Sequence, residues 1–93
     1  MKPETFTINV TASDIEVGEV ANCFQCPIAK AMFRQIPHCS SASARDTFLR
    51  FIRGAKLYIA NTPASAKVFM NDFDSGKVVT PFSFTADFHR ENS

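Results

Sequence analysis

Two cysteines separated by two residues form the part of this sequence best suited to chemistry. Cys23 and Cys26 stand directly before Pro27, a residue favoured at the first position of a helix. Unpaired N–H groups and the helix dipole lower the pKa of a thiol placed there, which favours redox chemistry through the thiolate. The same two thiolates have the spacing of half a zinc site. Redox and metal functions are therefore the first hypotheses to weigh.

A complete zinc site needs two more ligands, and His38 and Cys39 are the nearest candidates. Residues 27–36 predict a helix between the two pairs, which holds them roughly 15 Å apart at about 1.5 Å per residue. Zinc ligands lie within about 2.0–2.3 Å of the metal, so the two halves do not meet. Nucleophilic catalysis needs a base, and the only other histidine is His89. We predict no catalytic residue, no metal and no cofactor, and keep the cysteine pair as a weak metal candidate beside packing as small hydrophobic residues.

A basic stretch in the middle of the chain is the second candidate site. Its cations are interleaved with aromatic residues, and on a sheet such rings can stack on bases while the cations hold phosphates. Phenylalanine is also a typical core residue, and this chain has ten. The predicted partner- or nucleic-acid-binding residues are Arg45, Arg50, Arg53 and Lys56, and the neighbouring aromatics are Phe48, Phe51 and Tyr58.

The spacing of apolar residues in the first half of the chain predicts the elements around the cysteines. Residues 5–11 alternate between polar and apolar types, as in a half-buried strand. The Ser-x-x-Glu pattern over residues 13–16 predicts a helical turn that Gly18 stops. Residues 27–36 predict a helix, and residues 38–44 a polar loop. The buried face of this helix is expected to carry Ile28, Met32 and Ile36.

The basic stretch predicts a β-hairpin followed by a second helix. Strands over residues 47–53 and 56–60 are separated by Gly54-Ala55, where glycine permits a tight turn. Thr62-Pro63 is typical of a helix start, with Thr62 as the cap, and Gly76 of a helix end. The buried face of this second helix is expected to carry Ala66, Phe69, Met70 and Phe73.

The end of the chain completes the predicted fold. Residues 78–88 predict a last strand, with Pro81 at an edge or a bend, and residues 89–93 a frayed tail. The resulting order is strand, helix, strand, strand, helix, strand. We expect an α+β domain with a small four-stranded, mostly antiparallel sheet and two helices on one face. That order also matches the split βαβ pattern of ferredoxin-like folds.

Composition limits the class of protein. The chain has 93 residues, of which 45% are hydrophobic and 20% charged, which fits a single domain over residues 1–93 and excludes a disordered chain. It has no apolar run long enough for a membrane span, and no secretory signal. Three cysteines, an odd number, favour reduced thiols in a cytoplasm. A net charge of +1 conceals a basic middle between acidic ends, a layout that orients docking.

Two stretches of the sequence carry a resemblance to known proteins. The first runs from Ile8 to Ala31 and contains Cys-x-x-Cys-Pro-Ile-Ala; the second runs from Phe73 to Phe84 and contains Phe-Asp-Ser-Gly and Pro-Phe-Ser-Phe. In these stretches, about two fifths of the chain, the protein resembles a group of small proteins without an assigned activity that tailed bacteriophages encode. The resemblance implies expression inside an infected bacterium and a function exerted by binding a host or phage macromolecule.

We therefore expect a small, non-enzymatic, phage-encoded protein in the host cytoplasm. It would bind, and thereby inhibit, a host macromolecule such as a defence or nucleic-acid-processing complex, and its segregated charge would orient the encounter. The alternatives are a nucleic-acid-binding module that uses the basic hairpin, and a metal or redox protein that uses Cys23 and Cys26. No pattern in the sequence indicates an oligomeric state.

Overall fold

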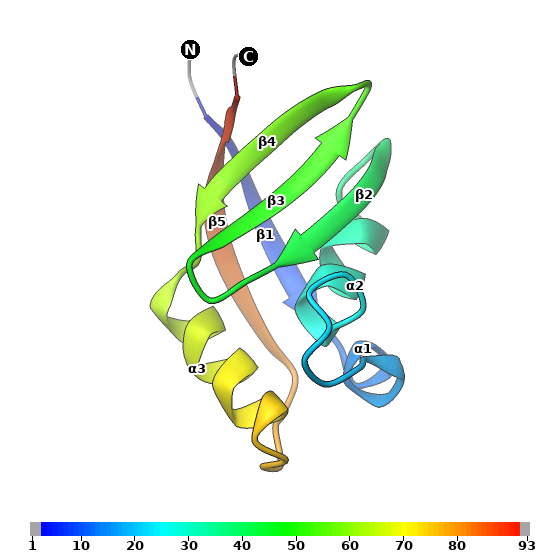
Figure 1. Ribbon diagram of the computed structural model, residues 1–93, viewed down its shortest axis with the longest axis vertical. Helices are drawn as coiled ribbons and strands as arrows, with labels where there is room; N and C mark the ends of the chain where they lie inside the picture. The colour runs from blue at the N-terminus through cyan, green and yellow to red at the C-terminus, as the bar shows by residue number, and fades with distance from the viewer. Residues whose placement is uncertain (1–2, 92–93) are drawn as a thin grey trace.

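The computed structural model describes residues 3–91, which form five strands and three helices (Figure 1). The predicted α+β class is confirmed, but the predicted count of four strands and two helices is wrong. Within the described residues, no helix is long and apolar enough to cross a bilayer. In chain order the elements are β1 (Glu4–Val10), α1 (Ala12–Val17), α2 (Pro27–Gln35), β2 (Cys39–Ala44), β3 (Phe48–Arg53), β4 (Lys56–Asn61), α3 (Ala64–Asp74) and β5 (Phe82–Arg90).

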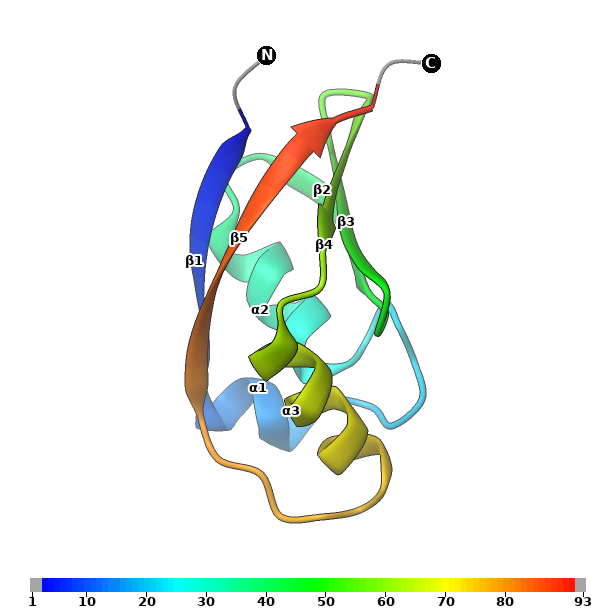
Figure 2. The same cartoon turned by 90° about the vertical axis from the view of Figure 1, so that its left-hand side faces the viewer.

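The five strands form one sheet in the order β1-β5-β4-β3-β2. Every neighbouring pair is antiparallel, so the described residues do not form the parallel strands that a split βαβ pattern contains. β4 and β5 pair at only two positions, Tyr58 with Arg90 and Ile59 with His89. The sheet curls at this junction, and α2 lies in the concavity between β1–β5 and β2–β4 (Figure 2).

The additional strand is β2, in the segment predicted as a polar loop. Ala42 and Ala44 belong to the core and are nearly fully buried; of the serines that alternate with them, Ser41 is partly exposed and Ser43 is buried. Serine and alanine have little strand preference, so the local signal was weak, and the pairing with β3 determines the conformation. Small side chains at these positions also allow α2 to pack closely against β2.

The additional helix, α1, begins earlier than the sequence predicts. Thr11 is its N-cap: the Thr11 hydroxyl accepts a hydrogen bond from the Asp14 backbone N–H at 3.2 Å, and the Asp14 carboxylate accepts one from the Thr11 backbone N–H at 2.9 Å. This reciprocal pair is a capping box with Asp in place of Glu or Gln. The predicted box between Ser13 and Glu16 is therefore wrong, because the chain already turns at Thr11.

The β3–β4 hairpin agrees with the sequence prediction. Gly54 and Ala55 both have positive φ, 58° and 63°, as a two-residue type I′ turn requires. The turn sets the register, in which Arg53 pairs with Lys56 and Phe48 pairs with Asn61 at the opposite end. Residues on β3 therefore alternate, so that Leu49 and Phe51 enter the core while Phe48 and Arg50 face outward.

The last helix and strand differ from the prediction at their boundaries. Pro63, rather than Thr62, is the N-cap of α3, and the Thr62 hydroxyl instead donates to the Arg45 carbonyl at 2.6 Å. Gly76 has a φ of 79°, which suits the left-handed end of a helix. β5 extends to Arg90, so its final residues lie in the region predicted as a frayed tail (89–93), of which residues 92–93 are outside the described residues.

The core lies between the concave face of the sheet and the two longer helices. On α2 the predicted face is confirmed, since Ile28, Met32 and Ile36 are at most 2% exposed. On α3 the predicted face packs at one end of the sheet, where Phe69 stacks on Phe82 with ring centres 4.6 Å apart. The largest fully buried side chains are Phe51, Phe88, Ile8, Ile28, Met32 and Leu49.

Candidate functional site

The four predicted binding cations do not form one surface. Arg53 pairs with Glu4 of β1 and donates to the Tyr58 hydroxyl at 3.2 Å. Its guanidinium carbon lies 4.7 Å from the centre of the Tyr58 ring. These contacts join β1 to the β3–β4 hairpin, so Arg53 serves to hold the sheet together. Lys56 is exposed at the turn end of the hairpin.

Arg45 and Arg50 remain together on the outer face of the sheet. Their guanidinium carbons lie 5.9 and 5.7 Å from the centre of the Phe48 ring, within the range of cation–π attraction. By the hairpin register, Phe48 is at the opposite end of β3 from Arg53 and Lys56. The predicted set is thus divided into one arginine pair around an aromatic ring and two cations elsewhere.

The cysteines are placed as packing residues. Cys26 is the N-cap of α2, and its Sγ accepts a hydrogen bond from the Ala29 N–H at 3.5 Å. Burial raises the pKa of the Cys26 thiol and also that of Cys39, which disfavours the nucleophilic thiolate. The cysteines Cys23, Cys26 and Cys39 are free thiols. Across residues 3–91, no group of three or more His, Cys, Asp or Glu side chains is arranged to hold a metal ion.

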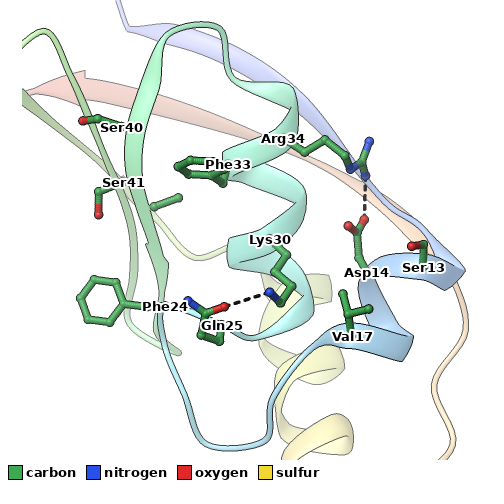
Figure 3. A pocket seen from close by; sticks show the side chains of 11 residues that line it. Ser13, Asp14, Val17, Phe24, Gln25, Lys30, Phe33, Arg34, Ser40 and Ser41 are labelled. Carbon is green, nitrogen blue, oxygen red and sulfur yellow. Dashed lines mark hydrogen bonds and ion pairs between the residues drawn. The ribbon is translucent and has the colours of Figure 1, made fainter.

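A surface groove of about 580 Å³ lies over α2, between α1 and β2 (Figure 3). Three large apolar side chains around it are half-exposed: Val17 of α1 at 56%, Phe24 of the preceding loop at 49%, and Phe33 of α2 at 53%. Their exposure is notable in a chain whose other aromatic residues are mostly covered. The polar residues that complete the groove include Asp14, Lys30, Arg34, Ser40 and Ser41.

One side of the groove is held by a buried carboxylate. Asp14 accepts hydrogen bonds from Arg34 at 2.7 Å and from the N–H and hydroxyl of Thr11 at 2.9 and 3.0 Å. Burial by itself raises the pKa of Asp14, but the bonds to Arg34 and Thr11 outweigh it, and the pKa lies below its ordinary value. This cluster fixes α1 against α2.

The remaining cation of the groove, Lys30, is not neutralised. Its Nζ donates to the Gln25 side-chain oxygen at 2.9 Å, a neutral partner (Figure 3). Among the described residues Lys30 forms no ion pair, whereas Arg34 pairs with Asp14. The groove therefore combines exposed apolar surface with one uncompensated positive charge.

Sequence reasoning did not find this groove, although one signal for it was present. Lys30, Phe33 and Arg34 follow the i, i+3, i+4 spacing and share a helix face opposite the buried stripe of α2. An aromatic residue between two cations on a solvent-facing helix surface is a sign of an interaction site. The strand residues on the other side could not be recognised, because β2 was predicted as a loop.

Comparisons of the chain with protein-family models, with curated proteins and with solved structures found no match. The likeness to phage-encoded proteins therefore stays a prediction from its two sequence stretches.

Proposed function

We propose that this protein acts by binding a protein partner, without chemistry of its own, and that the partner docks in the groove over α2. The observation that carries the proposal is the convergence of Val17, Phe24 and Phe33 from three separate segments on one groove. Exposed apolar groups that gather in one place, with polar groups around them, are typical of protein interaction sites. A few well-buried side chains, often aromatic, carry most of the binding energy at such sites.

The charge around the groove supports a protein partner with acidic groups. Lys30 is uncompensated, and a complementary carboxylate would orient the partner and accelerate its association. We propose that inhibition follows by occlusion of the patch of the target that the bound domain covers. We further propose, from the resemblance to phage-encoded proteins, that the partner is a host protein in the bacterial cytoplasm.

Site-specific photo-crosslinking tests the groove as the docking surface. The photoreactive residue p-benzoylphenylalanine replaces Phe33, and in a matched control it replaces Thr7 on the polar outer face of β1, where Thr7 contacts Thr85. After irradiation in bacterial lysate, we expect discrete adducts from position 33 that position 7 does not form, identified by mass spectrometry. Identical adducts from both positions, or none from position 33, would contradict the proposal.

A second candidate, nucleic-acid binding, is favoured by the arginine pair around Phe48. Arg45 and Arg50 form no ion pair among the described residues, so both charges are free to contact phosphates beside a ring that can stack on a base. The expected ligand is a single strand, because stacking needs unpaired bases.

Fluorescence anisotropy with labelled dT12 tests this second candidate. We expect log affinity to fall with log salt concentration, and the double change Arg45→Gln and Arg50→Gln to reduce the slope by about 0.7 for each lost phosphate contact. The control with equal net charge is Lys67→Gln and Lys77→Gln on and after α3. Loss of binding to the same extent in both double variants, or no binding by the wild type, excludes this function.

A further inference from the structure

The outer edge of β2 has backbone groups that face the groove. In the antiparallel pair of β2 and β3, alternate residues exchange hydrogen bonds. The Arg45 N–H donates to the Phe48 carbonyl at 2.9 Å, and Ser43 pairs with Arg50 in the same series. By this alternation the N–H and C=O of Ala42 point away from β3, toward the side where the groove lies.

Among residues 3–91, the outward backbone of this edge forms one hydrogen bond to the rest of the chain, at Ala44, and Ala42 is 6% exposed and lines the groove. The Ala44 N–H donates to the Cys23 carbonyl of the loop before α2 at 2.8 Å. Among the described residues, no side chain and no neighbouring loop forms a hydrogen bond with the N–H or C=O of Ala42. An edge strand with unpaired donors and acceptors is a template for another strand.

The surroundings of Ala42 define what an added strand would meet. The residue of the added strand that lies opposite Ala42 would point to the same face of the sheet as the Ala42 side chain, which is the face toward α2. On that face the Phe33 ring lies between α2 and β2 (Figure 3). Lys30 lies one helical turn from Phe33, about 4.5 Å along the helix axis. Residues two apart on a strand are about 6.7 Å apart, so side chains on one face of the added strand can contact both.

We propose that an extended segment of the partner protein binds as a sixth strand beside β2, and that this segment carries an apolar residue and an acidic residue two positions apart. The backbone pair at Ala42 supplies main-chain hydrogen bonds, Phe33 receives the apolar side chain, and Lys30 pairs with the carboxylate. Main-chain pairing combined with alternate side-chain contacts is an established mode of peptide recognition. The inference rests on the proposed docking groove and specifies how the partner enters it.

Selection from a library of random linear dodecapeptides tests the predicted chemistry. We expect selected peptides to contain an acidic residue two positions from an apolar one. In two-dimensional NMR spectra of the labelled protein, they should shift the amide resonances of Ala42 and Phe33, while that of Thr7 stays unchanged. Selected peptides without this pattern, or shifts confined to other surfaces, would overturn the proposal.

Swapping the charges of Lys30 and of the peptide's acidic residue tests their pairing, because recovered binding shows that the variant is folded. The change Lys30→Glu is expected to weaken binding of the selected peptide at least tenfold. A peptide with Lys in place of its acidic residue should bind the Lys30→Glu variant with recovered affinity, but not the wild type. Equal binding of both peptides to both proteins would contradict the inference. The change Ala42→Pro removes the N–H at the edge and should weaken every selected peptide, whatever its charge.

Two further outcomes separate this inference from the proposed function. If crosslinks from position 33 persist but Ala42→Pro has no effect on peptide or partner binding, the groove binds a partner by side chains and strand addition is wrong. If light scattering shows a dimer that Ala42→Pro dissociates, a second copy of the chain occupies the edge, and the inference of a partner segment is wrong.

Discussion

The β1 edge and the β2 edge of the sheet both flank α2, but their outward backbone groups are treated differently. At β1, the Gln35 side-chain amide accepts from the Asn9 N–H at 2.9 Å and donates to the Asn9 carbonyl at 2.6 Å, as a neighbouring strand would. Arg34 donates to the same carbonyl at 3.2 Å. At β2, Ala42 has no such partner among the described residues.

Side chains of α2 thus cap one outward backbone position of β1, Asn9, and none of β2, where the Cys23 carbonyl bonds the Ala44 N–H instead. The outward groups of Thr5 and Thr7 on β1, like those of Ala42 on β2, form no hydrogen bond among the described residues. The α2 residues after Phe33 turn toward β1 and satisfy its backbone at Asn9, whereas Phe33 itself faces β2 and offers only apolar contact (Figure 3). Edge strands are normally protected against association with other chains. What distinguishes Ala42 from Thr5 and Thr7 is that exposed apolar side chains and a free cation lie beside its open backbone position.

Proline substitutions along β2 should have the largest effect on stability, and they compare the side of β2 that faces β3 with the side that faces the groove. The N–H of Ser43 faces β3, so Ser43→Pro removes a ladder hydrogen bond and should lower the free energy of unfolding by about 3 kcal/mol. Ala42→Pro removes an N–H that faces the groove and should lower it by only about 1 kcal/mol, chiefly through crowding of the core. Urea denaturation measures both, and equal losses would show that both sides of β2 are paired.

Removal of the Asp14 carboxylate, which joins α1 to α2, should have the next largest effect on stability. Asp14→Ala loses the N-cap partner of Thr11 and the charged hydrogen bond to Arg34, which also contacts β1. We expect the free energy of unfolding to fall by about 2–3 kcal/mol. Glu16→Ala, on the exposed surface of the same helix, is the control and should change it by less than about 0.5 kcal/mol.

The pH dependence of stability should reveal the same carboxylate. The pKa of Asp14 is lower in the folded protein than its usual value, so its contribution is complete above the unfolded pKa of about 3.9 and is lost as the pH falls through the folded pKa. Thermal unfolding between about pH 5 and pH 2.5 should therefore show a steeper loss of stability in the wild type than in Asp14→Asn. Parallel curves would mean that Asp14 has an ordinary pKa.

The smallest expected effect comes from removing the side-chain cap at Asn9 of β1. Gln35→Leu keeps the size of the side chain but removes both hydrogen bonds to Asn9, and should lower the free energy of unfolding by about 1–2 kcal/mol. Hydrogen exchange should show faster exchange of the Asn9 amide, with that of Ala44 unchanged. Gln25→Leu, which removes a bond to Lys30 alone, is the matched control. Unchanged exchange at Asn9 would show that Gln35 does not protect the edge.

Local patterns predicted those elements whose conformation depends on neighbouring residues. The α2 helix begins at Pro27 and buries the predicted face, because apolar spacing and proline at the first turn are local signals. The hairpin turn at Gly54-Ala55 is likewise a local property of the backbone. The strand β2 was missed because serine and alanine carry no strong preference, and its partner strand decides its conformation.

The candidate site was predicted less well than the fold, for a related reason. Arg50 and Arg53 are three residues apart, so they lie on opposite faces of β3, a consequence of strand alternation that a count of nearby charges ignores. Arg53 then meets Glu4, which is far away in sequence. A cluster in sequence became a cluster in space only for Arg45 and Arg50.

The sequence alone determined the α+β class, the amphipathic faces of the longer helices and the hairpin register, since each follows from periodicity or from a turn. The tertiary structure alone decided where each strand edge is capped, which arginine is free and where a groove forms. These properties arise when segments distant in the sequence come together: α1, α2 and β2 form the groove, and β1 meets the β3–β4 hairpin at Arg53. No single segment contains the information. An edge is open or closed only in relation to what folds against it.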